Sequence, residues 1–230
     1  MNSHLIIALD TPDLASAEET VSRLSGIAFA FKIGHALVLG HGLDVVDKLH
    51  SAGAQRIFLD MKFHDIPNAV ALGVHEATRR GVWMMTLHAS GGDAMMLAAV
   101  EAAASAHTGI PPVLLGVTVL TSLDDDALST QIGIGRTVSE HAELLAKRAI
   151  QCGVDGVVCS GHEVAHLRTV LGSEPVLVVP GIRQPSGEIQ DQKRTMTGAD
   201  AISNGATYIV VGRALTDTRD PEKALASLGL

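Results

Sequence analysis

The chain repeats one pattern eight times: a short apolar run, a turn with polar residues or glycine, and a segment with helical spacing. We expect the eight apolar runs to be strands, at residues 5–10, 29–34, 56–62, 82–90, 113–121, 156–161, 176–183 and 208–213. Strands that alternate with helices form a parallel sheet. Eight such units predict an α/β protein with a closed (β/α)8 TIM barrel.

The segments between these runs support one domain, residues 1–230. Helical spacing is clear in residues 15–26, 35–53 and 91–107, and Asp13 is expected to cap the first of these helices. Hydrophobic residues make up 47% of the chain but aromatic residues only 3%, as is typical of parallel strands buried on both faces. An open doubly wound sheet is the alternative, but the GxGxxG turn expected after its first strand is missing.

Charge and cysteine content limit the partners and the compartment. The formal net charge is −8, so the basic footprint of a nucleic-acid-binding protein is absent, and an anionic substrate would need a local positive site. Cys152 and Cys159 form no CxxC pair, so we expect reduced thiols. The sequence shows neither a signal-peptide pattern nor an apolar run of membrane-spanning length. We therefore expect a cytoplasmic protein that binds neither nucleic acid nor membranes.

Polar residues gather where the expected strands end. They are Asp10, Lys32, Asp60, Lys62, His88, Thr118, Thr121, Arg183, Gly212 and Arg213. In a barrel the carboxyl ends of the strands form one rim, and that rim carries the active site in enzymes with this fold. One such residue is explained equally well by contact with water, but their coincidence on one rim predicts a site.

The densest charge pattern lies in residues 58–70, FLDMKFHDIPNAV. Asp60 and Lys62 are two residues apart, so on a strand their side chains point the same way, and Lys32 on the neighbouring strand can reach the same volume. With Asp65, three residues further on, they are expected to form an alternating Lys-Asp-Lys-Asp network. Partly desolvated charges persist when they are paired, and flanking carboxylates favour a protonated lysine. Such a lysine can donate a proton and stabilise developing negative charge. A structural ion-pair network is the alternative interpretation.

A phosphate site is expected at the last two strands. Barrel enzymes commonly bind phosphate with the loops after strands 7 and 8. Here Arg183 follows strand 7, and Gly212 and Arg213 end strand 8, where backbone N–H groups and a guanidinium can hold an anion. The intervening residues 183–197 are expected to form a phosphate-binding lid loop. Within this loop we interpret Lys193 and Arg194 as solvated.

Nine motifs that include these residues extend through nearly the whole chain. They are ALD (8–10), FKIG (31–34), LDMKFHDIPN (59–68), LHASGG (87–92), VTVLTS (117–122), DGVVCS (155–160), PGIR (180–183), DQKRTMT (191–197) and VVGRALT (210–216). The set resembles the orotidine 5′-phosphate decarboxylase family. The resemblance implies a carboxy-lyase that converts orotidine 5′-phosphate to UMP and CO2 in de novo pyrimidine biosynthesis, with no metal or organic cofactor.

The resemblance also implies a role for each residue of the rim. Lys62 would protonate C6 of the pyrimidine, and Asp60 would lie against the scissile carboxylate. Lys32 would bridge Asp60 and the ribose, Asp10 would bind a ribose hydroxyl, and Thr121 would contact the pyrimidine. The phosphate would be held by Arg183, Gln192, Gly212 and Arg213.

The same resemblance implies a homodimer, because Asp65 would reach into the neighbouring subunit's site. Two positions depart from the family pattern. Ala69 stands where threonine is usual and cannot make that residue's ribose or intersubunit hydrogen bond, and Ala214 replaces a usual proline.

Two other functions have some support in the sequence. His162, Glu163 and His166 spell HExxH, a zinc-binding helix motif, but no clear third ligand follows, so a solvated helix face is preferred. The closer rival is a magnesium-dependent sugar-phosphate decarboxylase or aldolase of the same suprafamily. Those relatives have an acidic metal ligand where this chain has Lys32, whose positive charge opposes a divalent cation.

Overall fold

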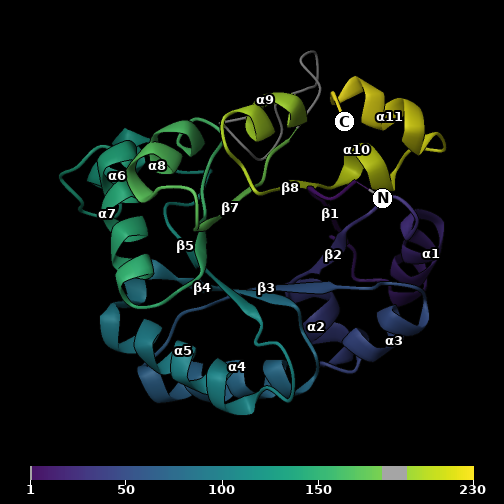
Figure 1. Ribbon diagram of the computed structural model, residues 1–230, viewed down its shortest axis with the longest axis horizontal. Helices are drawn as coiled ribbons and strands as arrows, with labels where there is room; N and C mark the ends of the chain where they lie inside the picture. Colours follow the sequence, from purple (N-terminus) through teal and green to yellow (C-terminus); the bar gives the residue numbers. More distant parts are fainter. Residues whose placement is uncertain (1, 183–195) are drawn as a thin grey trace.

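Eight parallel strands close into a barrel in the computed structural model, which describes residues 2–182 and 196–230 (Figure 1). The strands are β1 (Leu5–Ala8), β2 (Ala30–Ile33), β3 (Ile57–Phe63), β4 (Met84–His88), β5 (Val113–Val117), β6 (Gly156–Val158), β7 (Val176–Val179) and β8 (Tyr208–Val211). Each strand pairs with the next, and β1 pairs with β8, with Ile6 opposite Val210. The predicted TIM barrel is confirmed.

Most strands end earlier than the apolar runs suggested. The first run was expected to end at Asp10, but β1 ends at Ala8, and the fifth was expected to end at Thr121, but β5 ends at Val117. The residues beyond these ends still belong to the rim. The hydrogen-bonded pairing ends early because neighbouring strands diverge into loops. These loops hold the polar side chains over the barrel mouth.

Helices surround the barrel on the outside (Figure 1). They are α1 (Leu14–Leu24), α2 (His35–His41), α3 (Val45–Ser51), α4 (Pro67–Arg79), η1 (Ala89–Gly91), α5 (Asp93–Ala106), α6 (Asp125–Thr130), α7 (Val138–Gln151), α8 (Val164–Leu171), α9 (Gly198–Ser203), α10 (Arg213–Thr216) and α11 (Pro221–Ser227). Asp13 caps α1 as predicted, by accepting the Ser16 N–H. The expected helix over 35–53 is two helices, because Gly42 has φ of +68° and ends α2.

None of the helices in the described part of the chain is long and apolar enough to span a membrane.

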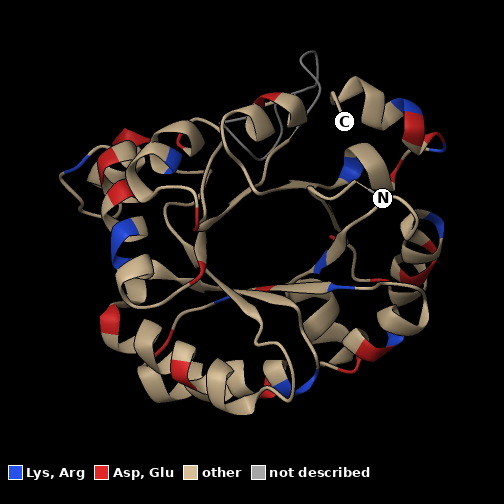
Figure 2. Ribbon diagram, in the orientation of Figure 1, with Lys and Arg blue, Asp and Glu red and all other residues tan. Residues whose placement is uncertain are grey.

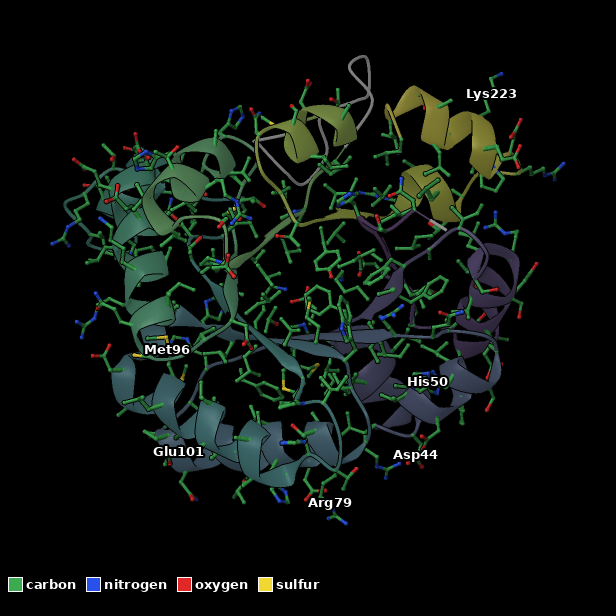
Figure 3. All side chains as sticks on the ribbon, viewed as in Figure 1. Asp44, His50, Arg79, Met96, Glu101 and Lys223 are labelled. Carbon is green, nitrogen blue, oxygen red and sulfur yellow. The ribbon has the colours of Figure 1, made fainter. Side chains whose placement is uncertain are left out.

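The barrel has one core outside the strands and another inside them. The outer core lies between strands and helices and contains most of the buried side chains. The inner core is made by Ile6, Ala8, Ala30, Phe58, Met84, Leu115, Val178 and Val210. Side chains consequently fill the ring of strands (Figure 3). Charged residues that are labelled in the same figure, such as Arg79, Glu101 and Lys223, lie on the outer helices.

An aromatic cluster lies at the amino-terminal end of the barrel. Phe29 precedes β2, Trp83 precedes β4 and Tyr208 begins β8, and their ring centroids are 5.3–5.4 Å apart. The Arg56 guanidinium lies 4.2 Å from the Phe29 centroid, within the range of a cation–π contact. These rings fill the amino-terminal end of the barrel. Access to the interior is therefore left to the carboxyl end of the strands.

Candidate active site

A cavity of about 1100 Å³ opens at the carboxyl ends of the strands. Predicted site residues that line it are Asp10, Lys32, Asp60, Lys62, Thr121, Gly212 and Arg213. Most charged positions lie on the outer helices, but some lie along β2 and β3 (Figure 2). Lys32, Asp60 and Lys62 on these two strands line the cavity. A concave site with several convergent charged groups is the usual form of a small-molecule binding site.

Four charged side chains, from β2, β3 and the segment after β1, form one connected network. Asp60 Oδ2 lies 2.9 Å from Lys62 Nζ and 3.6 Å from Lys32 Nζ. Lys32 Nζ also donates to Asp10 Oδ1 at 2.9 Å. The charges therefore alternate in sign from Asp10 through Lys32 and Asp60 to Lys62. Lys32, Asp60 and Lys62 meet as predicted, but the second carboxylate of the network is Asp10, and Asp65, which was predicted to be that member, is exposed.

The network holds Asp60 in its ionised form. Burial by itself raises the pKa of this carboxyl, whose side chain is only 14% exposed. Four effects lower the pKa: the positive charges of Lys32 and Lys62, and the hydrogen bonds from Lys62 and Thr86. Together they exceed the effect of burial, so the pKa of Asp60 lies below its ordinary value. Asp60 is therefore a carboxylate at neutral pH and serves as the common counter-ion of both lysines.

The backbone that presents this pair is irregular. Leu59 pairs with Met85, and the next pair is Phe63 with Leu87. Between these two pairs β3 advances by four residues while β4 advances by only two, so β3 bulges. Within this bulge Lys62 has φ of +49°, a left-handed conformation that residues other than glycine rarely adopt. Such strain costs about 1–3 kcal/mol and is concentrated at functional sites. Asp60 and Lys62 do meet, but through a bulge and not through the regular strand alternation that predicted their contact.

Thr86 on β4 completes the site and was missed by the sequence analysis. Its hydroxyl donates to Asp60 Oδ1 at 2.9 Å and accepts the Lys62 backbone N–H at 2.9 Å. The side chain is fully buried, with 0% exposure. The signal that could have identified it is the alternation along the strand, which places Thr86 on the same face as the rim residue His88.

The other side of the cavity lies at β7 and β8. Gly181, Ile182, Gly212 and Arg213 line it there, and α10 begins directly after Gly212. Arg183, Gln192 and residues 183–195 of the expected lid loop lie outside the described residues. The described part of the predicted phosphate site thus consists of the β8 end and the β7 end up to Ile182.

The structure does not bring Asp65 into the cavity of its own chain. This residue is exposed, and its Oδ1 accepts the Ile66 N–H at 2.6 Å. His64 and His88 lie close to each other, with their rings tilted and the ring centroids 5.1 Å apart. Burial lowers the pKa of His88, and the charges of His64 and Lys62 lower it further, so His88 is neutral at pH 7.

The HExxH motif does not form the helical arrangement that zinc binding requires. Helix α8 begins at Val164, so His162 precedes it, and His166 contacts Glu143 at 2.6 Å. Glu163 is buried, contrary to the expected solvated face, because its Oε2 accepts the Ser160 N–H at 3.0 Å. Across residues 2–182 and 196–230, no cluster of three or more His, Cys, Asp or Glu side chains could hold a metal ion.

Comparison with known proteins agrees with this architecture. The model of the orotidine 5′-phosphate decarboxylase / HUMPS family matches residues 3–228. The chain is 43% identical to an orotidine 5′-phosphate decarboxylase of Moorella thermoacetica, over 97% of this chain and 90% of that protein. It is 44% identical to a protein of the same name from Marinomonas, over 99% and 97%.

Solved structures give the same result. The crystal structure of orotidine 5′-phosphate decarboxylase from Lactobacillus acidophilus superposes with a TM-score of 0.86 at 34% identity, covering 99% of this chain and 98% of that one. The family model alone spans nearly the whole chain, and the relatives exceed 40% identity over almost their full length. The chain therefore belongs to the orotidine 5′-phosphate decarboxylase / HUMPS family.

Proposed function

We propose that this protein decarboxylates orotidine 5′-phosphate to UMP and CO2 without a cofactor, as a step of de novo pyrimidine biosynthesis. The observation that carries the proposal is the ammonium of Lys62, fixed 2.9 Å from Asp60 at the mouth of a cavity large enough for a nucleotide. The family membership and the names of the relatives support the same reaction.

The reaction needs a cation at the carbon that loses CO2. When the C6–carboxylate bond breaks, the electron pair remains on C6, and no conjugated group of the pyrimidine accepts it. An ammonium held at that carbon stabilises the developing charge, and it can then donate its proton to C6. Lys62 has this role in the proposal, and it regains its proton from solvent after CO2 has left.

The remaining charges position Lys62 and the ribose. Asp60 lies between the two lysines and would face the carboxylate that leaves. Lys32 bridges Asp60 and Asp10, so its ammonium and the Asp10 carboxylate are placed to bind ribose hydroxyls. The magnesium-dependent alternative is disfavoured, because the Lys32 ammonium lies between the Asp10 and Asp60 carboxylates and its positive charge opposes a divalent cation there.

The phosphate would lie at the β7 and β8 side of the cavity. Gly212, Arg213 and the start of α10 line that side, and a guanidinium can donate two hydrogen bonds to one phosphate. Arg183 and Gln192 would complete the grip from the lid loop. Because the phosphate does not react, its binding energy can be used to hold the substrate and to close the loop.

We further propose a homodimer in which Asp65 serves the neighbouring subunit's site. Asp65 is exposed and is not among the described residues that line its own cavity. Large apolar side chains are exposed beside it and on two helices: Ile66 is 68% exposed, Leu72 on α4 is 62% exposed and Leu39 on α2 is 78% exposed. A second copy of the chain would remove such side chains from water.

The reaction is tested by following orotidine 5′-phosphate loss by absorbance, with EDTA present. We expect the wild type to be active, Lys62→Ala to lose activity, and Lys48→Ala, an exposed lysine on α3, to retain it. Activity that requires a divalent metal, or that survives in Lys62→Ala, would contradict the proposal.

The shared site is tested by mixing two inactive variants, Lys62→Ala and Asp65→Ala. A mixed dimer contains one intact site, in which Lys62 comes from one subunit and Asp65 from the other. After subunit exchange at equal concentrations, about a quarter of wild-type activity is expected. Absence of any recovery, with mixed dimers present by mass spectrometry, would contradict an intersubunit role for Asp65.

A further inference from the structure

Thr86 connects two features of the site that would otherwise be independent. One hydroxyl bonds both the Asp60 carboxylate and the Lys62 backbone, each at 2.9 Å. Because Thr86 lies on a regular stretch of β4, which pairs with β5 at each residue from Met84 to His88, its position is fixed by the barrel. The bulged segment of β3 is thus attached to a strand that does not share its irregularity.

The bond to Lys62 replaces a lost ladder contact. In the bulge, β3 is out of register with β4 between Leu59 and Phe63, so the N–H groups there cannot all find strand partners. A buried N–H without an acceptor costs about 1–3 kcal/mol. The Thr86 oxygen accepts the Lys62 N–H, and it thereby stabilises the left-handed conformation from which the Lys62 side chain departs.

The bond to Asp60 determines how the carboxylate is turned. Rotation about the last side-chain bond of an aspartate is broad, so the carboxylate needs a second contact to fix its plane. Thr86 binds Oδ1, which leaves Oδ2 for Lys62 at 2.9 Å and Lys32 at 3.6 Å. Without the hydroxyl, the carboxylate could rotate and share both oxygens with the lysines.

We propose that Thr86 is a positioning residue for the decarboxylation: its hydroxyl fixes the plane of the Asp60 carboxylate and the backbone of Lys62, so that the Lys62 ammonium is held at the reacting carbon. This inference rests on the proposed function for its kinetic consequence. The geometric part, that the hydroxyl orients Asp60 and keeps it ionised, stands independently.

The first test compares three variants. Thr86→Val keeps the shape and removes the hydroxyl, and Thr86→Ser keeps the hydroxyl. Thr78→Val is the control, because it removes a buried hydroxyl that donates to the Val74 carbonyl within α4 and not to the network. We expect kcat of Thr86→Val to fall about 10- to 100-fold, as for loss of a hydrogen bond to a charged group, with KM changed less than about 3-fold. Thr86→Ser should stay within about 3-fold of wild type and Thr78→Val should match it.

The second test needs no activity. The charged groups that face Asp60 are Lys32 on β2 and Lys62 on β3, with Asp10 bound to Lys32, and the titratable but neutral His88 on β4 lies further away. Loss of the Thr86 hydrogen bond removes one of the influences that lower the pKa of Asp60. In protein labelled with ¹³C at the aspartate carboxyl, the Asp60 signal should therefore titrate at higher pH in Thr86→Val than in wild type or Thr86→Ser.

The outcomes separate the two proposals. If wild type does not decarboxylate the substrate, the proposed function fails, and the titration alone decides whether Thr86 orients Asp60. If wild type is active and Thr86→Val equals it in kcat, the positioning role is wrong. The role is also wrong if Thr86→Ser loses as much as Thr86→Val, because packing and not the hydroxyl would then be responsible. An Asp60 titration identical in all variants would overturn the geometric part.

Discussion

Replacing Asp60 with asparagine should destabilise the folded protein at neutral pH. The shape of the side chain is kept, but Lys32 and Lys62 lose the carboxylate between them. All three side chains are mainly buried, with exposed fractions of 14% for Asp60, 12% for Lys32 and 32% for Lys62. Removing one partner of a buried ion pair costs about 3–5 kcal/mol. Because Asp10 still pairs with Lys32 and Lys62 is partly solvated, we expect the lower limit, about 3 kcal/mol.

The effect on the melting temperature should depend on pH in a defined direction. For a chain of 230 residues, about 3 kcal/mol corresponds to a Tm lower by about 6–12 °C. The pKa of Asp60 is lowered in the folded state, so its stabilising contribution is complete above the pKa in the unfolded chain, about 3.9. That contribution is lost as the pH falls through the lower folded value. The Tm gap between wild type and Asp60→Asn should therefore be constant from about pH 7 to pH 5 and narrow below about pH 4.

Circular dichroism melts at one protein concentration provide the measurement, since the proposed dimer would make Tm depend on concentration. Glu143→Gln is the matched control: it also changes a carboxylate to an amide, but in surface pairs with Lys147 and His166, so little change in Tm is expected. An Asp60→Asn protein as stable as wild type at pH 7 would refute the reasoning. So would a Tm gap that does not narrow in acid.

Three further predictions concern the barrel. Gly156→Ala should yield little soluble protein while Gly26→Ala behaves as wild type, because a Cβ at Gly156 would lie 1.9 Å from a β7 carbonyl oxygen, whereas none lies within 4 Å at Gly26. Arg168→Met should lower Tm in melts far more than Arg148→Met, since the Arg168 guanidinium holds backbone carbonyls of the loops before β7 and β8; equal losses would contradict this. Cys159 should resist iodoacetamide until the protein unfolds, because burial raises the pKa of its thiol; labelling of native protein would contradict it.

The barrel could be predicted from the sequence because its signal is repeated. Each of the eight apolar runs contains a strand, and closure follows from their number. Strand ends could not be placed, because apolar and polar residues continue past the last ladder bond into the rim. The break between α2 and α3 was missed since both helices have helical spacing, and only the positive φ of Gly42 separates them.

The charge network was predictable in part. Asp60, Lys62 and Lys32 were expected to meet, and they do, because β2 and β3 are neighbours in the barrel. The bulge could not be predicted from the residue types. Nothing in the sequence of residues 60–62 distinguishes a regular strand from one in which the lysine has a left-handed conformation. Thr86 was overlooked for a related reason, since a hydroxyl inside an apolar strand resembles ordinary core until its partners are known.

The position of the bulge explains how one strand can serve both stability and chemistry. Up to Leu59, β3 is regular on both sides and fully packed: Ile57, Phe58 and Leu59 are at most 2% exposed and pair in register with β2. The register toward β4 shifts only beyond Leu59, where side chains become partly exposed at the cavity. The strained backbone thus begins where the packed core ends. The strain therefore lies at the rim and does not disturb the packing or the strand pairing of the barrel below it. Thr86, buried in the regular neighbouring strand, then supplies the bonds by which the ordered core fixes the irregular segment above it.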